Sequence, residues 1–211
     1  MSTIINLKKA LLITAVPFFI AASCNKNDTK PCYNYTPYSF NVTSEWSPQR
    51  EVYNIGDTIF LTSSFPKVLL DNISNRNIDY SNSTGISGNV TFGRMDTVSK
   101  LVNNSFSHFE AIPIIGNVTS ISANPEKGIN AHYIESALYN FKVGIKLKQK
   151  GLYVIGVTDL ACKGLAGKDC TNAGFNMTVT NSNKNINLFQ YALGYTPDAL
   201  LQKSIYCFRV Q

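Results

Sequence analysis

The sequence predicts a mainly β protein, an antiparallel β-sandwich with one short helix near the C-terminus. Only 15% of the 211 residues are charged, well below the usual quarter, so long salt-bridged helices are not expected. Asparagine is abundant, at 23 residues, and it favours turns. Apolar and polar residues alternate with a period of two in short segments that Gly, Asn and Ser clusters separate.

The first 24 residues have the parts of a secretory signal. Two lysines lie near the start, residues 10–22 form an uncharged and largely apolar run, and small residues precede Cys24. The run is too short to span a bilayer comfortably. Ala21-Ala22-Ser23-Cys24 resembles the lipobox of bacterial lipoproteins, in which cleavage precedes the cysteine and its sulfur receives a diacylglycerol. The alternative is an ordinary signal-peptidase site, which leaves Cys24 available for a disulfide.

The lipobox resemblance divides the chain into three parts. Residues 1–23 are the signal peptide, residues 24–37 are the lipidated N-terminus with a polar tether, and residues 38–211 form a single β domain. Removal of the signal leaves 188 residues and, with the loss of two lysines, lowers the formal net charge from +6 to +4. Asn25 stands where lipoproteins retained in the inner membrane have Asp. We therefore expect the outer membrane, with the domain facing either the periplasm or the outside.

The four other cysteines fit two disulfides in an oxidising compartment. Three connectivities are open. We favour Cys162 with Cys170 across a Gly-rich loop, which leaves Cys32 with Cys207. The alternative, a four-cysteine metal site, needs a paired CxxC-type spacing that these residues lack.

The strands are expected in order along the domain. Residues 40–46 and 59–65 alternate as half-buried strands do. A helix is predicted from Ile186 to Leu193, with Asn185 as its N-cap and Gly194 as its stop. Further strands are expected at residues 86–92, 106–115, 138–147, 152–158, 175–180 and 205–210.

The last strand gives a geometric expectation for Cys207. Tyr206, Phe208 and Val210 alternate with Ile205, Cys207 and Arg209. If the aromatic set faces the core, Cys207 points outward, where a tether cysteine such as Cys32 can reach it.

Two segments resemble the immunoglobulin-like sandwich. Residues 53–61 look like the turn into strand B, with Gly56-Asp57 at the turn, and residues 150–155 look like the start of strand F, with Tyr153 at the tyrosine-corner position. The stretch between the two segments is longer than usual. The resemblance implies an elaborated Ig-like sandwich with a large middle insertion, and it implies nothing about activity.

A second resemblance concerns lipoproteins of Bacteroidota. It rests on the Gly-Asp-Thr-Ile and Gly-Leu-Tyr-Val segments, the abundant asparagine and the Ser-Cys lipobox. In that group Asp-Ser/Thr followed by an aliphatic residue can accept an O-linked glycan. Thr97 in Asp96-Thr97-Val98 is therefore a candidate O-glycosylation site, whereas Thr58 fits the triplet but lies in an expected strand.

No motif predicts catalysis, a metal site or a cofactor. His108 and His132 are isolated, and each is expected on the surface or half-buried. Residues 85–89 approach the GxSxG elbow of serine hydrolases, but the second glycine comes one residue early, so a turn into a strand is the better interpretation. Residues 164–168 lack the spacing of a phosphate-binding loop. A carboxylate pair assembled in space stays open.

Two features could serve binding. Lys142, Lys146, Lys148 and Lys150 share one face of an expected strand, and one interpretation is contact with an anionic surface such as lipid headgroups or acidic glycan. The alternatives are a solvated face or lysines that protect an edge strand. Aromatic residues between positions 33 and 46 could stack on sugar rings, or pack the first strand against the last.

These observations favour a lipid-anchored cell-envelope protein that acts as a non-catalytic binding or structural accessory module. Its expected partners are the membrane, through the lipid anchor, and a glycan or another envelope protein; nucleic acid is not expected. The alternative is a small secreted hydrolase with a spatially assembled site. A third hypothesis is a component of an envelope assembly, which a large exposed apolar patch would indicate.

Overall fold

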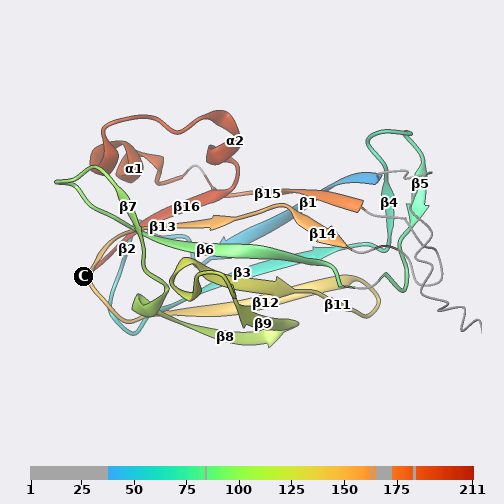
Figure 1. Cartoon of the computed structure of the whole chain (residues 1–211), viewed down its shortest axis with the longest axis horizontal. Helices are drawn as coiled ribbons and strands as arrows, with labels where there is room; N and C mark the ends of the chain where they lie inside the picture. The colour runs from blue at the N-terminus through green and yellow to red at the C-terminus, as the bar shows by residue number, and fades with distance from the viewer. Residues whose placement is uncertain (1–37, 84, 163, 165–172, 183) are drawn as a thin grey trace, which may run out of the picture. The chain divides into compact units, whose positions relative to one another are not determined.

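The computed structural model describes residues 38–83, 85–162, 164, 173–182 and 184–211 (Figure 1). These residues are mainly β, as predicted, with two short helices, α1 (Ile186–Leu193) and α2 (Ala199–Gln202). Two 3-10 turns are η1 (Phe106–His108) and η2 (Pro125–Lys127). The strands are β1 (Tyr38–Ser47), β2 (Val52–Tyr53), β3 (Thr58–Phe65), β4 (Val68–Leu70), β5 (Asn77–Asp79), β6 (Ser87–Met95), β7 (Val102–Asn104), β8 (Phe109–Ile115), β9 (Asn117–Ser120), β10 (Gly128–His132), β11 (Ile134–Glu135), β12 (Tyr139–Leu147), β13 (Gly151–Val157), β14 (Leu160–Cys162), β15 (Ala173–Val179) and β16 (Ile205–Val210).

The strands form two layers that β14 connects. One layer has the order β8-β12-β3-β1-β15, with β11 also on β12. The other has the order β6-β13-β16-β2, with β7 and β10 on the free side of β6 and β9 beyond β10. Strand β14 pairs with β15 over three residues but with β6 only at Ala161–Ser87, so it is the narrow bridge between the layers. The hairpin β4–β5 is a separate small sheet.

Aromatic side chains from both layers meet in the core. The Trp46 ring on β1 lies 6.0 Å from that of Tyr206 on β16, and the Phe109 ring on β8 lies 4.9 Å from that of Tyr153 on β13. All four residues are buried, which confirms the packing interpretation for Trp46. These contacts hold the layers face to face, and burying rings of this size dominates core energetics.

The sandwich is not wholly antiparallel, in contrast to the prediction. Strand β1 runs parallel to β15, with Tyr38 opposite Ala173 and Ser44 opposite Val179, and the short β2 runs parallel to β16. Period-two alternation shows which face of a strand is buried but carries no information on the direction of its neighbours. This is why the sequence predicted the strands and missed the two parallel pairs.

Both immunoglobulin-like features are present. At the turn into β3, Gly56 has φ +91°, and the Asp57 carboxylate accepts a hydrogen bond from the Asn54 amide at 2.9 Å. The Tyr153 hydroxyl lies 3.1 Å from the Gln149 carbonyl oxygen and 3.2 Å from that of Lys150, the geometry of a tyrosine corner.

Most predicted strands are confirmed within a few residues, with one difference before β8. The predicted strand at residues 106–115 begins as η1, and only Phe109–Ile115 extends as a strand. The segment at residues 85–89 is the expected turn into a strand, because Gly85 has φ +71° and β6 follows.

Helix α1 has the predicted bounds, and it covers the outer face of the second layer. Gly194 ends the helix in the left-handed region, at φ +81°. Asn185 precedes it, but its side chain makes no cap; its amide donates instead to the carbonyls of Arg50 and Cys207, each at 2.9 Å. On the side that faces the sheet, Leu188, Phe189, Ala192 and Leu193 pack on Met95, Val154, Ile205 and Cys207.

The prediction that Cys207 points outward, where another cysteine can reach it, is wrong. Cys207 does lie on the opposite face of β16 from Tyr206 and Phe208, but α1 covers that face and the thiol is fully buried. Burial raises the pKa of the Cys207 thiol to about 12. The geometric reason for joining Cys207 to Cys32 is therefore removed.

Candidate functional site

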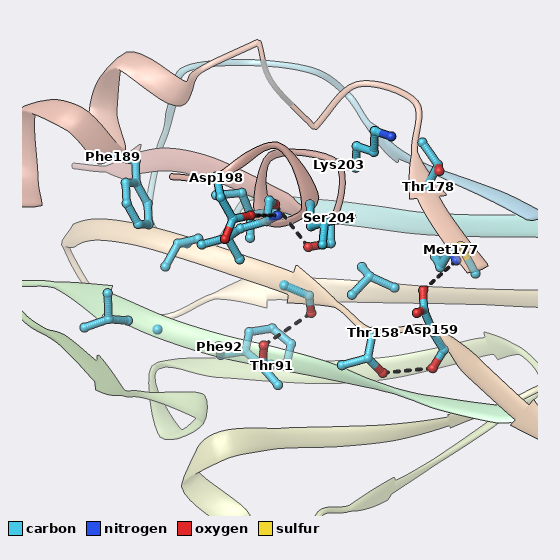
Figure 2. Close-up of a pocket in the computed structure, with 18 of the residues that line it drawn as sticks. Thr91, Phe92, Thr158, Asp159, Met177, Thr178, Phe189, Asp198, Lys203 and Ser204 are labelled. Carbon is cyan, nitrogen blue, oxygen red and sulfur yellow. Dashed lines mark hydrogen bonds between the residues drawn. The ribbon is translucent and has the colours of Figure 1, made fainter. Parts of the chain in front are cut away.

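An open groove of about 980 Å³ lies beside helix α1, between the segment that carries α2 and the outer faces of β6, β13 and β15. Figure 2 shows its surroundings, with Phe189, Asp198 and Ser204 on the helical side, Thr91 and Thr178 on strands β6 and β15, and Thr158 directly after β13. A groove of this volume is within the range of small-molecule and oligomer sites.

Two glycines, Gly93 and Gly156, lie in the floor of the groove. A Cβ atom on Gly156 would lie 2.8 Å from the Thr91 hydroxyl oxygen, and one on Gly93 would overlap the side chain of Val102. In the β6–β13 ladder, Thr91 lies opposite Gly156, and Gly93 lies opposite Val154. The side chains of Val102 and Thr91 therefore occupy the space that a larger residue at Gly93 or Gly156 would need, and the two glycines allow this close packing in the floor.

Asparagine side chains line the end of the groove at β1 and β15. Asn41 and Asn176 are opposite each other in the parallel ladder, and the Asn176 amide donates to the Asn41 side-chain oxygen at 3.1 Å. Asn72 also contacts Asn41, at 3.1 to 3.2 Å. These bonds fix the orientation of the amides, so their remaining donors and acceptors are preorganised.

Two carboxylates line the groove, and both already accept backbone hydrogen bonds. Asp159 accepts from the Met177 amide at 2.8 Å, and Asp198 accepts from the Leu201 amide at 2.7 Å as the N-cap of α2. Lys127 and Lys203 also line the groove. The charges among the described lining residues balance, with two carboxylates and two amines.

The helical side of the groove carries exposed apolar and aromatic residues. Tyr195 follows the helix stop at Gly194, is 55% exposed, and holds its ring at 87° to that of Phe189, with 5.4 Å between the centroids. Leu200 and Leu201 add aliphatic surface, and Leu200 is 79% exposed. One side of the groove is therefore apolar, whereas its floor and opposite end are polar.

The predicted lysine row is divided between a strand and a turn. Lys142 and Lys146 lie on β12, which ends at Leu147, so Lys148 and Lys150 belong to the following turn. Strand β12 is paired with β3 and β8 and is not an edge strand, so the edge-protection alternative is wrong. The Lys142 amine lies 5.4 Å from the centroid of the Phe60 ring. Contact of these lysines with an anionic surface stays a prediction.

Thr97 lies in the tight turn between β6 and β7 and is exposed. The Asp96 carboxylate accepts hydrogen bonds from the amides of Val98 and Ser99, which shapes this turn. The position is therefore accessible, and O-glycosylation of Thr97 stays a prediction.

Cys162, like Cys207, is a buried free thiol. Their favoured partners, Cys170 and Cys32, lie outside the described residues, as do Cys24 and the glycine-rich segment at 165–168. The Cys162–Cys170 disulfide and the lipidation of Cys24 stay predictions. The Cys32–Cys207 pairing is also untested, but the burial of Cys207 under α1 disfavours it.

The histidines are half-buried, as expected, and lie apart from the groove. His108 Nδ1 lies 3.0 Å from the Tyr153 hydroxyl, and His132 Nε2 lies 3.1 Å from that of Thr119. Within the described ranges, no three His, Cys, Asp or Glu side chains come together in a metal-binding arrangement. None of the helices in those ranges has the length and apolar character needed to cross a membrane.

Sequence reasoning missed the groove, whose lining residues range from Asn41 to Ile205. The available signal was the pair of glycines inside expected strands, Gly93 and Gly156, since an isolated strand glycine indicates a bulge or a close backbone approach.

Together, the fold and the groove define a β-sandwich protein with an open groove beside a helical cover. No protein-family model matches the sequence, and no curated protein matches it. Among solved structures, it is similar to the second type II cohesin module of the cellulosomal adaptor ScaA scaffoldin of Acetivibrio cellulolyticus. The TM-score is 0.35 and the identity 11%, over 65% of this chain and 92% of that chain. It is also similar to a cohesin module of a family 33 glycoside hydrolase of Clostridium perfringens, with TM-score 0.32 and 14% identity, over 65% of this chain and 98% of that chain. Similarities at this level carry no functional inference, so the groove is interpreted from its own residues.

Proposed function

We propose that this protein is a lipid-anchored, non-catalytic binding module of the outer membrane, and that the groove beside α1 is its binding site. The observation that carries the binding role is the groove itself, about 980 Å³ in volume, with preoriented amides at one end. The lipobox-like sequence that ends at Cys24 and the Asn25 that follows it support the anchor and the membrane.

The groove favours binding over hydrolysis. Among its described lining residues no histidine is present, and its two carboxylates, Asp159 and Asp198, are each hydrogen-bonded to a backbone amide. Asp159 lies just after β13, and Asp198 caps α2, so each already orients a neighbouring segment.

The anchor is tested by acyl labelling in cells. The wild-type protein should incorporate a labelled fatty acid and fractionate with the outer membrane, whereas Cys24→Ala should do neither. Globomycin, which blocks lipoprotein signal peptidase, should make the unprocessed form accumulate. An unlabelled wild-type protein would refute the anchor.

The binding role is tested by filling the groove. The membrane-extracted wild-type protein is compared with Thr178→Trp, which places an indole in the groove from the exposed face of β15, and with Thr62→Trp on β3, outside the described lining. Each protein is screened on a glycan array and in envelope-protein pull-downs. Ligands retained by wild type and Thr62→Trp but lost by Thr178→Trp support the proposal. Ligands bound equally by all three proteins place binding elsewhere and refute the groove as the site.

A further inference from the structure

Among the described residues, the backbone around the groove offers no free row of amide donors for a peptide strand. Strands β6 and β13 pair with each other, and β13 pairs with β16 on its other side. The edge of β15 beyond Phe175 faces the groove, but its amides are engaged: Met177 donates to the Asp159 carboxylate and Val179 to the Lys203 carbonyl, each at 2.8 Å. A peptide that adds as a strand needs such donors, so recognition here depends on side chains.

The side chains that remain are hydroxyls and amides on one side and an aromatic ring on the other. The Thr178 hydroxyl and the side-chain oxygen of Asn176, whose amide already donates to Ser39 and Asn41, present neutral hydrogen-bonding groups at the strand end. The Thr91 hydroxyl, which donates to the Gly156 carbonyl at 3.4 Å, can still accept a bond at the floor. Tyr195 presents an exposed ring, oriented by its contact with Phe189. This combination fits a ligand that has many hydroxyl groups and also an apolar ring face, which is the chemistry of a sugar.

The charge of the groove points to a neutral ligand. Asp159 and Asp198 balance Lys127 and Lys203, so the described lining has no excess of one sign to attract a polyanion. The groove is also open to solvent on one side, so a ligand larger than the groove can bind with part of its length outside it.

From these contacts we infer that the groove binds a neutral glycan chain, with one sugar ring on Tyr195 and sugar hydroxyls bonded to Asn176 and the threonines. This inference rests on the proposed function, because it names the ligand class of the same groove.

The test uses the membrane-extracted protein and an array of neutral and acidic oligosaccharides of four to eight units, followed by calorimetry with the best neutral binder. Tyr195→Ala should weaken binding by about tenfold or more, and Asn176→Ala by about the same factor, because each removes a direct contact. Tyr191→Ala is the matched control, since Tyr191 is 65% exposed on α1 and lies outside the described groove lining. It should bind as the wild type does.

The outcomes separate this inference from the proposed function. Neutral glycans that bind in a Tyr195-dependent way support both. Selective binding of acidic glycans, or enrichment of a random dodecapeptide library that Thr178→Trp abolishes, would overturn the neutral glycan and leave the binding module standing. Failure of every neutral, acidic and peptide probe to bind in a groove-dependent way would overturn both.

Discussion

Replacing Tyr153 by Phe is expected to lower the free energy of unfolding by about 1–2 kcal/mol. The side chain is fully buried, and its hydroxyl lies 3.0 to 3.2 Å from His108 Nδ1 and from the carbonyl oxygens of Gln149 and Lys150. A hydroxyl has one proton, so the two carbonyls share a single donated bond. The oxygen also accepts from His108 when the imidazole proton is on Nδ1. The variant therefore loses one to two net hydrogen bonds at the start of β13.

The assay is urea unfolding followed by far-ultraviolet circular dichroism, with the m-value expected to stay constant. For a domain of this size the loss corresponds to a fall in Tm of about 2–8 °C. Tyr191→Phe is the matched control, because it removes the same atom from a ring that is 65% exposed, and it should change stability by less than about 0.5 kcal/mol. Equal midpoints for the two variants would show that the tyrosine corner contributes nothing, and the reasoning would be refuted.

Three further predictions concern a carboxylate, a thiol and a glycine. Burial alone would raise the pKa of Asp71, but hydrogen bonds from Ser39 and Ser74 lower it to about 2. Because the folded pKa lies below the unfolded one, this contribution to stability is present above about pH 4 and lost as the pH falls toward 2. Asp71→Asn should flatten that part of the profile of Tm against pH, and parallel profiles would contradict it. Because its thiol is buried, Cys207 should resist iodoacetamide in the native protein at pH 8. In urea without reductant it should react, and peptide mapping would detect the modified peptide. Recovery of a Cys32–Cys207 peptide would instead establish the disulfide. Gly128→Ala should destabilise the protein by about 1–3 kcal/mol in urea unfolding, because the new Cβ atom would overlap the Val90 carbonyl oxygen. Gly174→Ala, which meets nothing within 4 Å, should cost much less, and equal losses would show that the overlap is relieved cheaply.

Local signals in the sequence predicted local structure well. The bounds of α1 followed from Asn185 before the helix and the stop at Gly194, although the Asn185 side chain makes no cap. The corner at Tyr153 followed from a short segment around one turn. Such features depend on residues close in sequence. The parallel pairing of β1 with β15 depends on residues about 135 positions apart, which no local pattern records.

The error at Cys207 has a similar origin. Alternation in the last strand correctly separated Tyr206 and Phe208 from Ile205 and Cys207, but it was interpreted as core against solvent. Both faces are covered, one by the opposite layer and the other by α1. Ile205, an apolar residue on the second face, could have predicted that another element covers that face, since a strand that is buried on both sides has apolar residues on both.

The limits of the groove can be traced to a change of residue type along one face of two neighbouring strands. On the outer face of β13 the residues run Leu152, Val154, Gly156, and on that of β6 they run Met95, Gly93, Thr91. The apolar end of each series packs under α1, and the small or hydroxyl end forms the groove floor. Because Thr91 lies opposite Gly156 in the ladder, the change occurs at the same level on both strands. Helix α1 therefore covers this face only as far as the apolar residues extend. The groove begins where the residues of the face become small or polar, because a helix would bury no apolar side chains there.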